Sequence, residues 1–473
     1  MVQALNKGEH GGKRRIAVIG AGPAGLVTAR TLVSAGADVS IFERGSAVGG
    51  TWLGADHNGR NFIYKNLHIN TSKRLTAFEG YPFPKETQVV PDHRDMARYL
   101  QGYAEHFGLI GKVRFGCAVS EVVPAGHGAS GGWIVKTDGC PEKIFDAVVV
   151  AIGPFNRPFH SSDLAAFQGT YIHSADYRDP VSYAGKKVCI VGAGNSAVDI
   201  GSDVCRTAER VVMVARSPVF VTPHLVRGVS FNDISRALQK PFIPSKLRRA
   251  LLRGLVRIIH GKMTDCGFRP LTHKVHATIS STVVQDILFK RIKVKNGIGS
   301  IDGRKITFTD GESDEFDVLF AATGFVTEFP FLSPSIVSTE GRLRLFNRIV
   351  PPGQDGLYFV GMINIDTPVN FACEQQAKWV AGIEMGRAKL PPMNEMHDAI
   401  ARKDDWVRRE YGSAARHSLQ EESVIYYREL KRSLRDALNR SASSGGKPSS
   451  ATVRNDRPTT LENGSATAGR TDR

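Results

Sequence analysis

The stretch Ile16-Ala-Val-Ile-Gly20-Ala-Gly22-Pro-Ala-Gly25 decides the fold of this chain of 473 residues. Its four leading apolar residues indicate a buried parallel strand, and the apolar residues after the glycines keep helical spacing. Gly20 allows a tight turn, Gly22 lets the backbone approach a pyrophosphate, and Gly25 lets helix and strand pack closely. The free N–H groups at the start of the helix then face the negative charge. The stretch therefore predicts a strand, a turn and a helix that bind a dinucleotide.

A carboxylate and a second glycine turn support this interpretation. Glu43 ends the next predicted strand, about 20 residues after the glycines, where a carboxylate can accept both ribose hydroxyls. Such a carboxylate suits FAD or NAD and would repel a 2′-phosphate. The turn Gly49-Gly50-Thr51-Trp52 follows, where backbone amides can reach the flavin side of a cofactor. An ordinary glycine-rich turn is the alternative, but the strand context and Glu43 favour dinucleotide binding.

The stretch Lys187-Val-Cys-Ile-Val-Gly192-Ala-Gly194-Asn195-Ser196 repeats the opening pattern. A glycine-rich turn seldom occurs twice by chance with the same flanks, so the repeat implies a second dinucleotide. Arg216 stands after the next strand, where the first unit has Glu43. An arginine there can pair with a ribose 2′-phosphate, which favours NADPH over NADH. A surface arginine at a strand end is the alternative.

Composition limits the class of protein. The length suits two or three domains, and an apolar content of 41% is ordinary for a globular protein. No segment approaches the roughly 20 apolar residues that span a bilayer, and the polar start lacks the apolar part of a signal peptide, so we expect a cytoplasmic protein. Six scattered cysteines without a Cys-x-x-Cys pair argue against disulfides, structural zinc and a redox dithiol, and no metal is expected.

The formal charge of +16 is concentrated in two segments. Eight Lys or Arg and no acid lie from Arg236 to Lys262, and the residues from Ala401 onward carry a further basic excess. No recognised nucleic-acid module accompanies these segments, and no aromatic residues are interleaved with the basic ones. Nucleic acid is therefore not expected as a partner.

A basic amphipathic helix is predicted over residues 245–262. Its basic residues fall on one narrow stripe, and apolar residues cover the rest of the circumference; the stripe consists of Lys246, Arg249, Arg253 and Arg257. Such a helix suits a peripheral membrane contact, a subunit contact as in a homodimer, or a lid over a substrate channel. A helix packed on its own protein with a solvated basic face is the slightly favoured alternative.

Three further motifs complete a recognisable set. They are Asn70-Thr71-Ser72-Lys73 ahead of Tyr81-Pro-Phe-Pro84, the turn Ala322-Thr323-Gly324, and Phe167-x-Gly169-x-x-x-His173-Ser174-x-x-Tyr177. With the two glycine loops, they resemble the flavin-containing monooxygenases, which are class B single-component flavoproteins, across residues 14 to 435. The last motif is the most specific and looks like the identifying sequence of that family. The similar Baeyer–Villiger monooxygenases usually carry Trp at its last position, so Tyr177 favours heteroatom oxygenation.

The resemblance implies a mechanism and roles for particular residues. NADPH reduces FAD, O2 adds to form a C4a-hydroperoxyflavin, and a soft nitrogen or sulfur nucleophile of a small organic substrate takes the terminal oxygen. Asn70 matches the active-site asparagine of the family, whereas the residues alone favour an Asx-type turn at this position. His173 is assigned to the connection between domains and to NADP-coupled geometry, not to acid–base chemistry. Thr323 and Gly324 are assigned to the cofactor sites.

Other activities stay open at this point. A Baeyer–Villiger or keto-acid-decarboxylating flavin monooxygenase, an NADPH oxidase that releases peroxide, and a non-catalytic peripheral membrane flavoprotein share many of these motifs. A disulfide reductase of the same fold needs a dithiol beside the flavin, and the sequence contains none.

The predicted fold is α/β, with two Rossmann-like dinucleotide-binding domains. Residues 1–175 form the first part of a discontinuous FAD-binding domain, residues 176–320 an inserted NADPH-binding domain, and residues 321–436 the second part of the FAD-binding domain. Residues 437–473 are rich in Ser, Gly, Thr and Arg and have almost nothing to bury, so a disordered tail is predicted.

Overall fold

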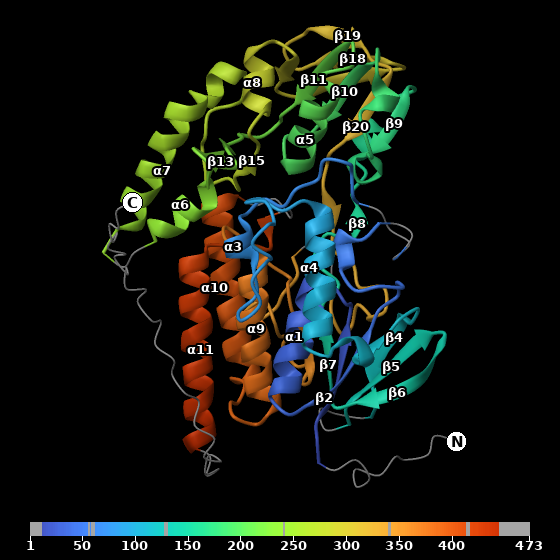
Figure 1. Cartoon of the computed structure of the whole chain (residues 1–473), viewed down its shortest axis with the longest axis vertical. Coiled ribbons are helices and arrows are strands. Elements are labelled where there is room, and N and C mark those ends of the chain that lie inside the picture. The colour runs from blue at the N-terminus through green and yellow to red at the C-terminus, as the bar shows by residue number, and fades with distance from the viewer. Residues whose placement is uncertain are drawn as a thin grey trace, which may run out of the picture.

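Two parallel sheets form the centre of the molecule (Figure 1). The computed structural model describes residues 12–54, 57, 62–126, 131–239, 242–338, 342–412 and 417–443. The first sheet has the order β22-β7-β1-β2-β3 and consists of β1 (Arg15–Ile19), β2 (Asp38–Phe42), β3 (Val113–Arg114), β7 (Ala147–Val150) and β22 (Leu357–Phe359). The second has the order β16-β11-β10-β20-β9 and consists of β9 (Thr170–His173), β10 (Lys187–Val191), β11 (Arg210–Val214), β16 (Ile292–Lys295) and β20 (Val318–Ala321). The fold is α/β, as predicted.

The first sheet is discontinuous in sequence. Its strand β22 comes after the second sheet in the chain and pairs in parallel with β7, Leu357 lying opposite Val148. The second sheet is therefore inserted into the first unit, as predicted. One boundary differs, because β9 precedes residue 176 but pairs in parallel with β20, His173 lying opposite Ala321. The second sheet begins within the range predicted for the first part of the FAD-binding domain.

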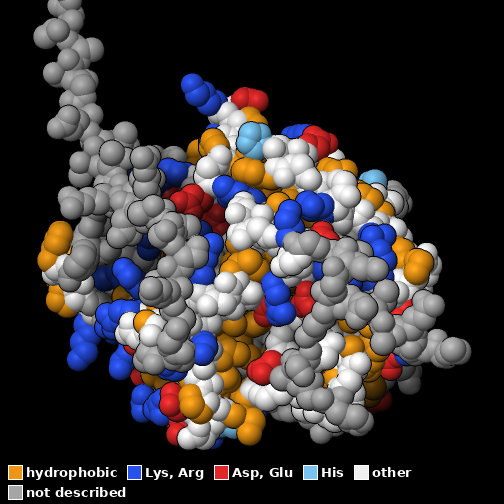
Figure 2. Space-filling view, turned by 90° about the horizontal axis from the view of Figure 1, so that it is seen from below, with side chains coloured by type: hydrophobic (Ala, Val, Ile, Leu, Met, Phe, Trp, Pro, Cys, Tyr) orange, Lys and Arg blue, Asp and Glu red, His pale blue; other side chains and the backbone are white. Residues whose placement is uncertain are grey.

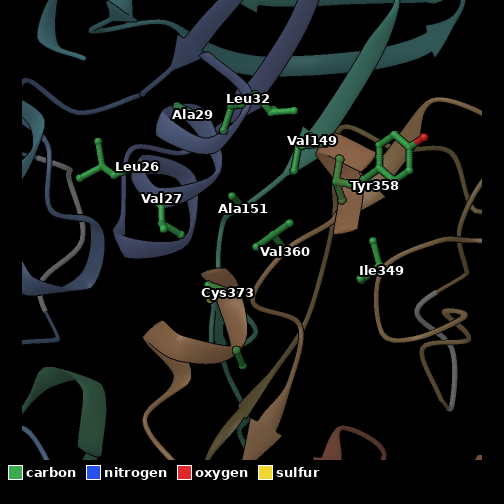
Figure 3. Close-up of a cluster of buried hydrophobic side chains, with 14 of the residues drawn as sticks. Leu26, Val27, Ala29, Leu32, Val149, Ala151, Ile349, Tyr358, Val360 and Cys373 are labelled. Atoms are coloured by element: carbon green, nitrogen blue, oxygen red, sulfur yellow. The ribbon is translucent and has the colours of Figure 1, made fainter. Parts of the chain in front are cut away.

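Helix α1 (Pro23–Ser34) packs on the first sheet and holds the opening glycine turn in place. Pro23 suits the first helical position, where no intrahelical donor is needed. The apolar residues of α1 recur on one side and join a buried cluster with β7, β22 and α9 (Val369–Glu384). Figure 3 shows this cluster, which contains Leu26, Val27, Ala29, Leu32, Val149, Ala151, Ile349, Tyr358, Val360 and Cys373.

A small antiparallel sheet corrects one prediction. Its strands are β4 (Ala118–Pro124), β5 (Trp133–Asp138) and β6 (Cys140–Phe145). Their register brings Cys117, which precedes β4, beside Cys140, so that their Cα atoms lie 5.9 Å apart and their sulfur atoms form a disulfide. The prediction of no disulfide was therefore wrong, because strand register joins cysteines that are distant in sequence. The cysteines at 189, 205, 266 and 373 are free and buried.

The remaining elements connect and cover the two sheets. The other helices outside the C-terminal region are α3 (Lys73–Thr76), α4 (His93–His106), α5 (Asn195–Val204), α6 (Phe231–Ala237), α7 (Ser245–His260) and α8 (Val283–Leu288). The other strands are β8 (Arg157–Pro158), β12 (Val221–Thr222), β13 (Leu225–Val226), β14 (Val229–Ser230), β15 (Thr278–Ile279), β17 (Ile298–Asp302), β18 (Lys305–Phe308), β19 (Ser313–Glu315), β21 (Phe325–Val326), β23 (Asn364–Ile365) and β24 (Gln420–Glu421).

Helix α7 packs against the protein along only one side. Arg248, Val256 and His260 are buried, and the side chains of Lys246, Arg253 and Arg257 are exposed. The helix therefore rests on its own protein with a basic face in solvent, which was the favoured interpretation. Four apolar side chains of the helix are exposed as well, and these are Leu247, Leu251, Ile258 and Ile259.

On the face of the molecule seen from below, basic side chains are interspersed with others (Figure 2). Figure 2 views the end of the molecule that lies lowest in Figure 1, and it shows Lys and Arg side chains in several groups with acidic and apolar side chains between them. Among the helices that the structure describes, none is both long and apolar enough to cross a membrane.

Two long helices close the described chain and shorten the predicted tail. Helix α10 (Met393–Tyr411) and helix α11 (Ser423–Ser443) lie beside α9 and α1 (Figure 1). The prediction of a disordered tail from residue 437 is wrong at its start, because α11 continues to Ser443. Ala437 is fully buried, and its carbonyl accepts a hydrogen bond from Lys389 N at 3.0 Å. The rest of the predicted tail, residues 444–473, lies outside the described residues.

Candidate active site

One cavity of about 940 Å³ joins residues from the two halves of the fold. Gly20, Gly22 and Glu43 line it from the first sheet, and Asn195 lines it from the second. A volume of this size suits a cofactor or a small ligand. Every predicted site residue that lines the cavity lies on a loop or at the end of an element, and the full set is Gly20, Gly22, Glu43, Gly50, Thr51, Trp52, Asn70 and Asn195.

The first glycine loop is packed so closely that its glycines have no room for a side chain. Gly20 has φ +101°, and a Cβ there would lie 2.9 Å from the Ala151 carbonyl oxygen. A Cβ on Gly25 would lie 1.8 Å from the Gly20 carbonyl oxygen, and one on Gly50 would lie 2.9 Å from Gly22 Cα. No side chain caps α1, so the N–H groups of its first turn are free for an anion. This arrangement fits the pyrophosphate of FAD.

Glu43 is held against the first glycine turn by backbone amides. The residue is 7% exposed. Its Oε2 accepts a hydrogen bond from Ala21 N and its Oε1 accepts one from Gly45 N, each at 2.8 Å. Each carboxylate oxygen has a further acceptor position, so Glu43 can still receive the ribose hydroxyls. The two glycine turns are joined instead by the backbone, because Gly49 N donates a hydrogen bond to the Ala21 carbonyl at 3.0 Å.

Asn70 lines the cavity with an uncommitted side chain. Its carbonyl accepts a hydrogen bond from Asn232 Nδ2 of α6 at 2.7 Å, which fixes the backbone. Its side-chain amide makes no hydrogen bond to any residue that the structure describes. The cap of α3 comes instead from Ser72, whose hydroxyl accepts from Leu75 N at 3.2 Å. The structure therefore does not favour the Asx-type turn, and it leaves the Asn70 amide available to a ligand.

The second glycine loop has a similar backbone but is more open. Gly192 has φ +134°, and a Cβ there would lie 2.3 Å from the Ala322 carbonyl oxygen. Gly194, by contrast, has no atom within 4 Å of its Cβ position. Asn195 begins α5 and accepts a hydrogen bond from Ile279 N through its Oδ1 at 2.9 Å. Ser196 follows it in the first turn of α5 and does not line the cavity.

Arg216 lies beside this loop and outside the cavity lining. It follows β11 by two residues, and Val214 at the end of β11 accepts a hydrogen bond from Gly192 N at 3.0 Å. The Arg216 side chain is exposed. The residue therefore stands next to the second glycine loop, where a nucleotide phosphate bound from solvent could meet it.

His173 connects β9 with the Ala-Thr-Gly turn. The ring is 1% exposed. Its Nδ1 accepts a hydrogen bond from Ala175 N at 3.1 Å, and its Nε2 lies 3.1 Å from the Gly324 carbonyl oxygen, to which it must donate. Both partners are backbone groups, so they select one neutral tautomer. Burial lowers the pKa of His173, which also favours the neutral form. The ring is thus a structural connector.

The other residues of this motif are packed inside the protein and do not line the cavity. Tyr177 is fully buried, and its hydroxyl donates to Asp203 Oδ2 at 3.1 Å. Phe167 is buried, and a Cβ on Gly169 would lie 2.6 Å from its ring. Thr323 donates a hydrogen bond through its hydroxyl to the Phe159 carbonyl. The structure therefore places the motif in the packing around the second sheet rather than on the cavity wall.

A further group of cavity-lining residues was not predicted as a site. It comes from α6, α7, the segment before β15 and the end of β24, and it includes Asn232, Arg248, Arg249, Lys274, His276 and Glu422. The basic segment that starts at Arg236 was the only signal in the sequence. Helical spacing located its charged stripe, but it could not tell which side of α7 would face a cavity.

Comparison with known proteins identifies the family. The model of the family described as flavin-binding monooxygenase-like matches residues 13–438. The chain belongs to this family. Flavin-containing monooxygenase 5 of Cavia porcellus is 28% identical over 437 residues, which cover 88% of this chain and 82% of that protein. Flavin-containing monooxygenase 3 of Homo sapiens is 29% identical over 437 residues, which also cover 88% of this chain and 82% of that protein. The solved structure of S-allyl-L-cysteine S-oxygenase from Allium sativum is 26% identical, with a TM-score of 0.67 and coverage of 91% and 93%.

The flavin-binding monooxygenase-like family uses FAD and NADPH, and the two glycine loops agree with these cofactors. The close approach of Gly22 and Gly50 leaves only backbone at the first loop, as a bound pyrophosphate requires. The Glu43 carboxylate beside it suits a ribose without a 2′-phosphate. The family assignment makes the chain a flavin-dependent monooxygenase.

Proposed function

We propose that this monooxygenase uses NADPH and O2 to oxygenate a soft nitrogen or sulfur nucleophile of a small organic substrate. The observation that carries the proposal is the uncommitted side-chain amide of Asn70 on the wall of the cavity shared by the two glycine loops. An oxygenation site needs such a neutral donor where the flavin, the nicotinamide and the substrate meet. The S-oxygenase from Allium sativum, which is similar over 91% of this chain, supports a sulfur nucleophile.

We assign the two cofactors to the two sheets. The first glycine loop, Glu43 and the turn at Gly50, Thr51 and Trp52 would hold FAD. The second loop, from Gly192 to Ser196, would hold NADPH, with Arg216 pairing with the 2′-phosphate. Bound FAD supplies the electrons that activate O2. The residues of this chain bind and orient the reacting groups and exclude water from them.

Asn70 would stabilise the reacting oxygen by a hydrogen bond. Its amide nitrogen donates without carrying a titratable proton, so it neither quenches the oxygen by protonation nor competes as a nucleophile. The 2.7 Å hydrogen bond from Asn232 Nδ2 to the Asn70 carbonyl oxygen fixes the backbone at Asn70 and so limits the positions of its side chain. His173 would hold the end of β9 against the turn after β20 through Gly324 and would transfer no proton.

The ratio of product to NADPH consumed tests this proposal. The FAD-loaded protein is supplied with NADPH, O2 and, separately, a thioether, a tertiary amine and a cyclic ketone. We expect close to one product per NADPH with the thioether or the amine. Hydrogen peroxide equal to the NADPH consumed, with every substrate, would instead identify an NADPH oxidase. A lactone from the ketone alone would identify a Baeyer–Villiger enzyme.

We also propose a peripheral contact through the outer side of α7. Exposed Leu247, Leu251 and Ile258 lie beside exposed Lys246, which is the combination that favours an anionic membrane surface over a homodimer contact. Vesicles with anionic lipid should therefore pellet the protein at low salt and release it at high salt. A Leu251→Ser, Ile258→Ser double variant that pellets with the vesicles as well as the wild type would contradict this contact. If instead the wild type dimerises at all salt concentrations and the double variant does not, the surface is a contact with a second copy of the chain.

A further inference from the structure

Several charged residues line the cavity near α7, and the acidic ones among them already have partners. Glu421 accepts hydrogen bonds from Arg348 at 2.8 Å and from Lys403 at 3.0 Å. Asp366 accepts a hydrogen bond from Ser423 N at 2.8 Å, at the start of α11, where the helix dipole favours a negative charge. Neither carboxylate therefore requires a cation from a ligand.

The third carboxylate, Glu422, is shared among three cations. Lys274 donates to it at 3.2 Å, and Lys274 also pairs with Glu410 at 2.6 Å. Arg248 and Arg249 lie farther away, with their guanidinium nitrogens 3.9 Å and 3.7 Å from Glu422 Oε1. Lys274 is thus engaged by two carboxylates, whereas the two arginines reach Glu422 only through these long contacts.

Arg248 is the least satisfied of these groups. It is 7% exposed and lines the cavity. Its guanidinium carries five N–H donors, yet it makes no hydrogen bond to any described residue, and its one ion pair is the long contact with Glu422. The guanidinium therefore faces the cavity with its donors unused by the protein, and it is positioned for an anion that arrives with a ligand.

We propose that Arg248, assisted by Arg249, binds a carboxylate of the substrate. A guanidinium matches a carboxylate by two parallel hydrogen bonds, which a lysine could not form. Leu252 and Leu271 line the same part of the cavity and suit the apolar chain between the carboxylate and the nucleophile. Together with the proposed oxygenation, on which this inference rests, the site implies a substrate that is a carboxylic acid and carries a thioether or an amine at a distance from the acid group.

A pair of thioethers that differ only in the charged group tests this inference. The probes are 3-(methylthio)propanoate and 3-(methylthio)propanamide, and the FAD-loaded protein is compared with Arg248→Gln and Arg257→Gln variants. We expect the wild type to have a KM for the acid at least about tenfold below that for the amide, since a charge-assisted pair gives this factor. Arg248→Gln should raise the KM for the acid by about tenfold and leave the amide unchanged. Arg257 lies on the same helix outside the cavity, so Arg257→Gln should have the same ratio of KM values for the acid and the amide as the wild type.

Binding to the oxidised holoprotein separates this inference from the proposed reaction. The dissociation constants of both probes come from the change in flavin absorbance without turnover. Preference for the acid without product formation would support the carboxylate site and contradict the oxygenation. Product from both probes with equal KM, or no binding of the acid, would overturn the carboxylate site. A rise in the KM for NADPH in Arg248→Gln, with the acid unaffected, would assign the arginine to the nucleotide. If Arg248→Gln does not fold, the ratio of the KM for the acid to the KM for the amide, measured for the wild type and for Arg249→Gln, still tests the carboxylate site.

Discussion

The two glycine loops begin with the same strand, turn and helix but differ in how closely their surroundings enclose them. At the first loop, the Cβ positions of Gly20, Gly25 and Gly50 fall within 3 Å of backbone atoms. At the second, Gly192 is packed as closely, but Gly194 has free space around it. The residues that would recognise the ribose differ in the same way, since Glu43 is buried and bonded to two amides while Arg216 is exposed.

This difference matches two kinds of cofactor. A rigid, buried cradle suits a cofactor that stays bound through many turnovers, and an open loop with an exposed cation suits one that is exchanged in each turnover. We therefore expect changes at the first loop to remove FAD, and changes at the second loop to affect only NADPH.

The largest effect is expected from Gly25→Ala. Its new methyl group would lie 1.8 Å from the Gly20 carbonyl oxygen, so α1 or the turn must move, at a cost of more than about 3 kcal/mol. The purified variant should contain little FAD, as measured by the ratio of flavin to protein absorbance. Gly194→Ala is a control at the second loop, where a methyl group meets free space, and it should retain FAD. Equal FAD content in the two variants would contradict the assignment of FAD to the first loop.

Asn70→Ala should affect chemistry without releasing either cofactor. The loss of one hydrogen-bond donor should slow product formation by about a hundredfold. NADPH oxidation should continue and release hydrogen peroxide, which is measured together with product and FAD content. Asn66→Ala is a suitable control, because Asn66 donates to Asp203 at 3.0 Å and does not line the cavity. Normal coupling in Asn70→Ala would remove this residue from the reacting centre.

The smallest effects are expected from the two ribose-recognition residues, and they should fall on different cofactors. Glu43→Gln places an amide donor against the Ala21 or Gly45 N–H, so the Kd for FAD should rise by about tenfold or more. Arg216→Gln should raise the KM for NADPH by about tenfold, leave that for NADH unchanged and leave FAD content unchanged. Titration of the apoprotein with FAD and steady-state kinetics give these values. An Arg216→Gln variant that still prefers NADPH would assign the 2′-phosphate to another residue.

The sequence predicted those parts of the molecule that depend on local pattern. The glycine spacing predicted both turns, and strand periodicity placed Glu43 and Arg216 at the ends of corresponding strands. The amphipathic pattern predicted α7 close to its observed bounds, Ser245–His260. Each of these features is determined within a short stretch of chain, so no knowledge of distant contacts was needed.

The features that the sequence did not predict depend on contacts between distant segments. The disulfide between Cys117 and Cys140 follows from the register of three strands. The extra residues of α11 follow from the burial of Ala437 against the segment at Lys389. The burial of Arg248 follows from the side of α7 that packs on the protein. Helical spacing shows which residues share a face, but only tertiary packing decides which face is covered.

The most direct test of the central claim is the origin of the oxygen in the product. The FAD-loaded protein is supplied with NADPH and a thioether under an atmosphere of isotopically labelled ¹⁸O2, and the sulfoxide is analysed by mass spectrometry. We predict a sulfoxide that carries one labelled oxygen atom and is formed in proportion to the NADPH consumed. Unlabelled product, or labelled hydrogen peroxide in place of sulfoxide, would contradict this claim.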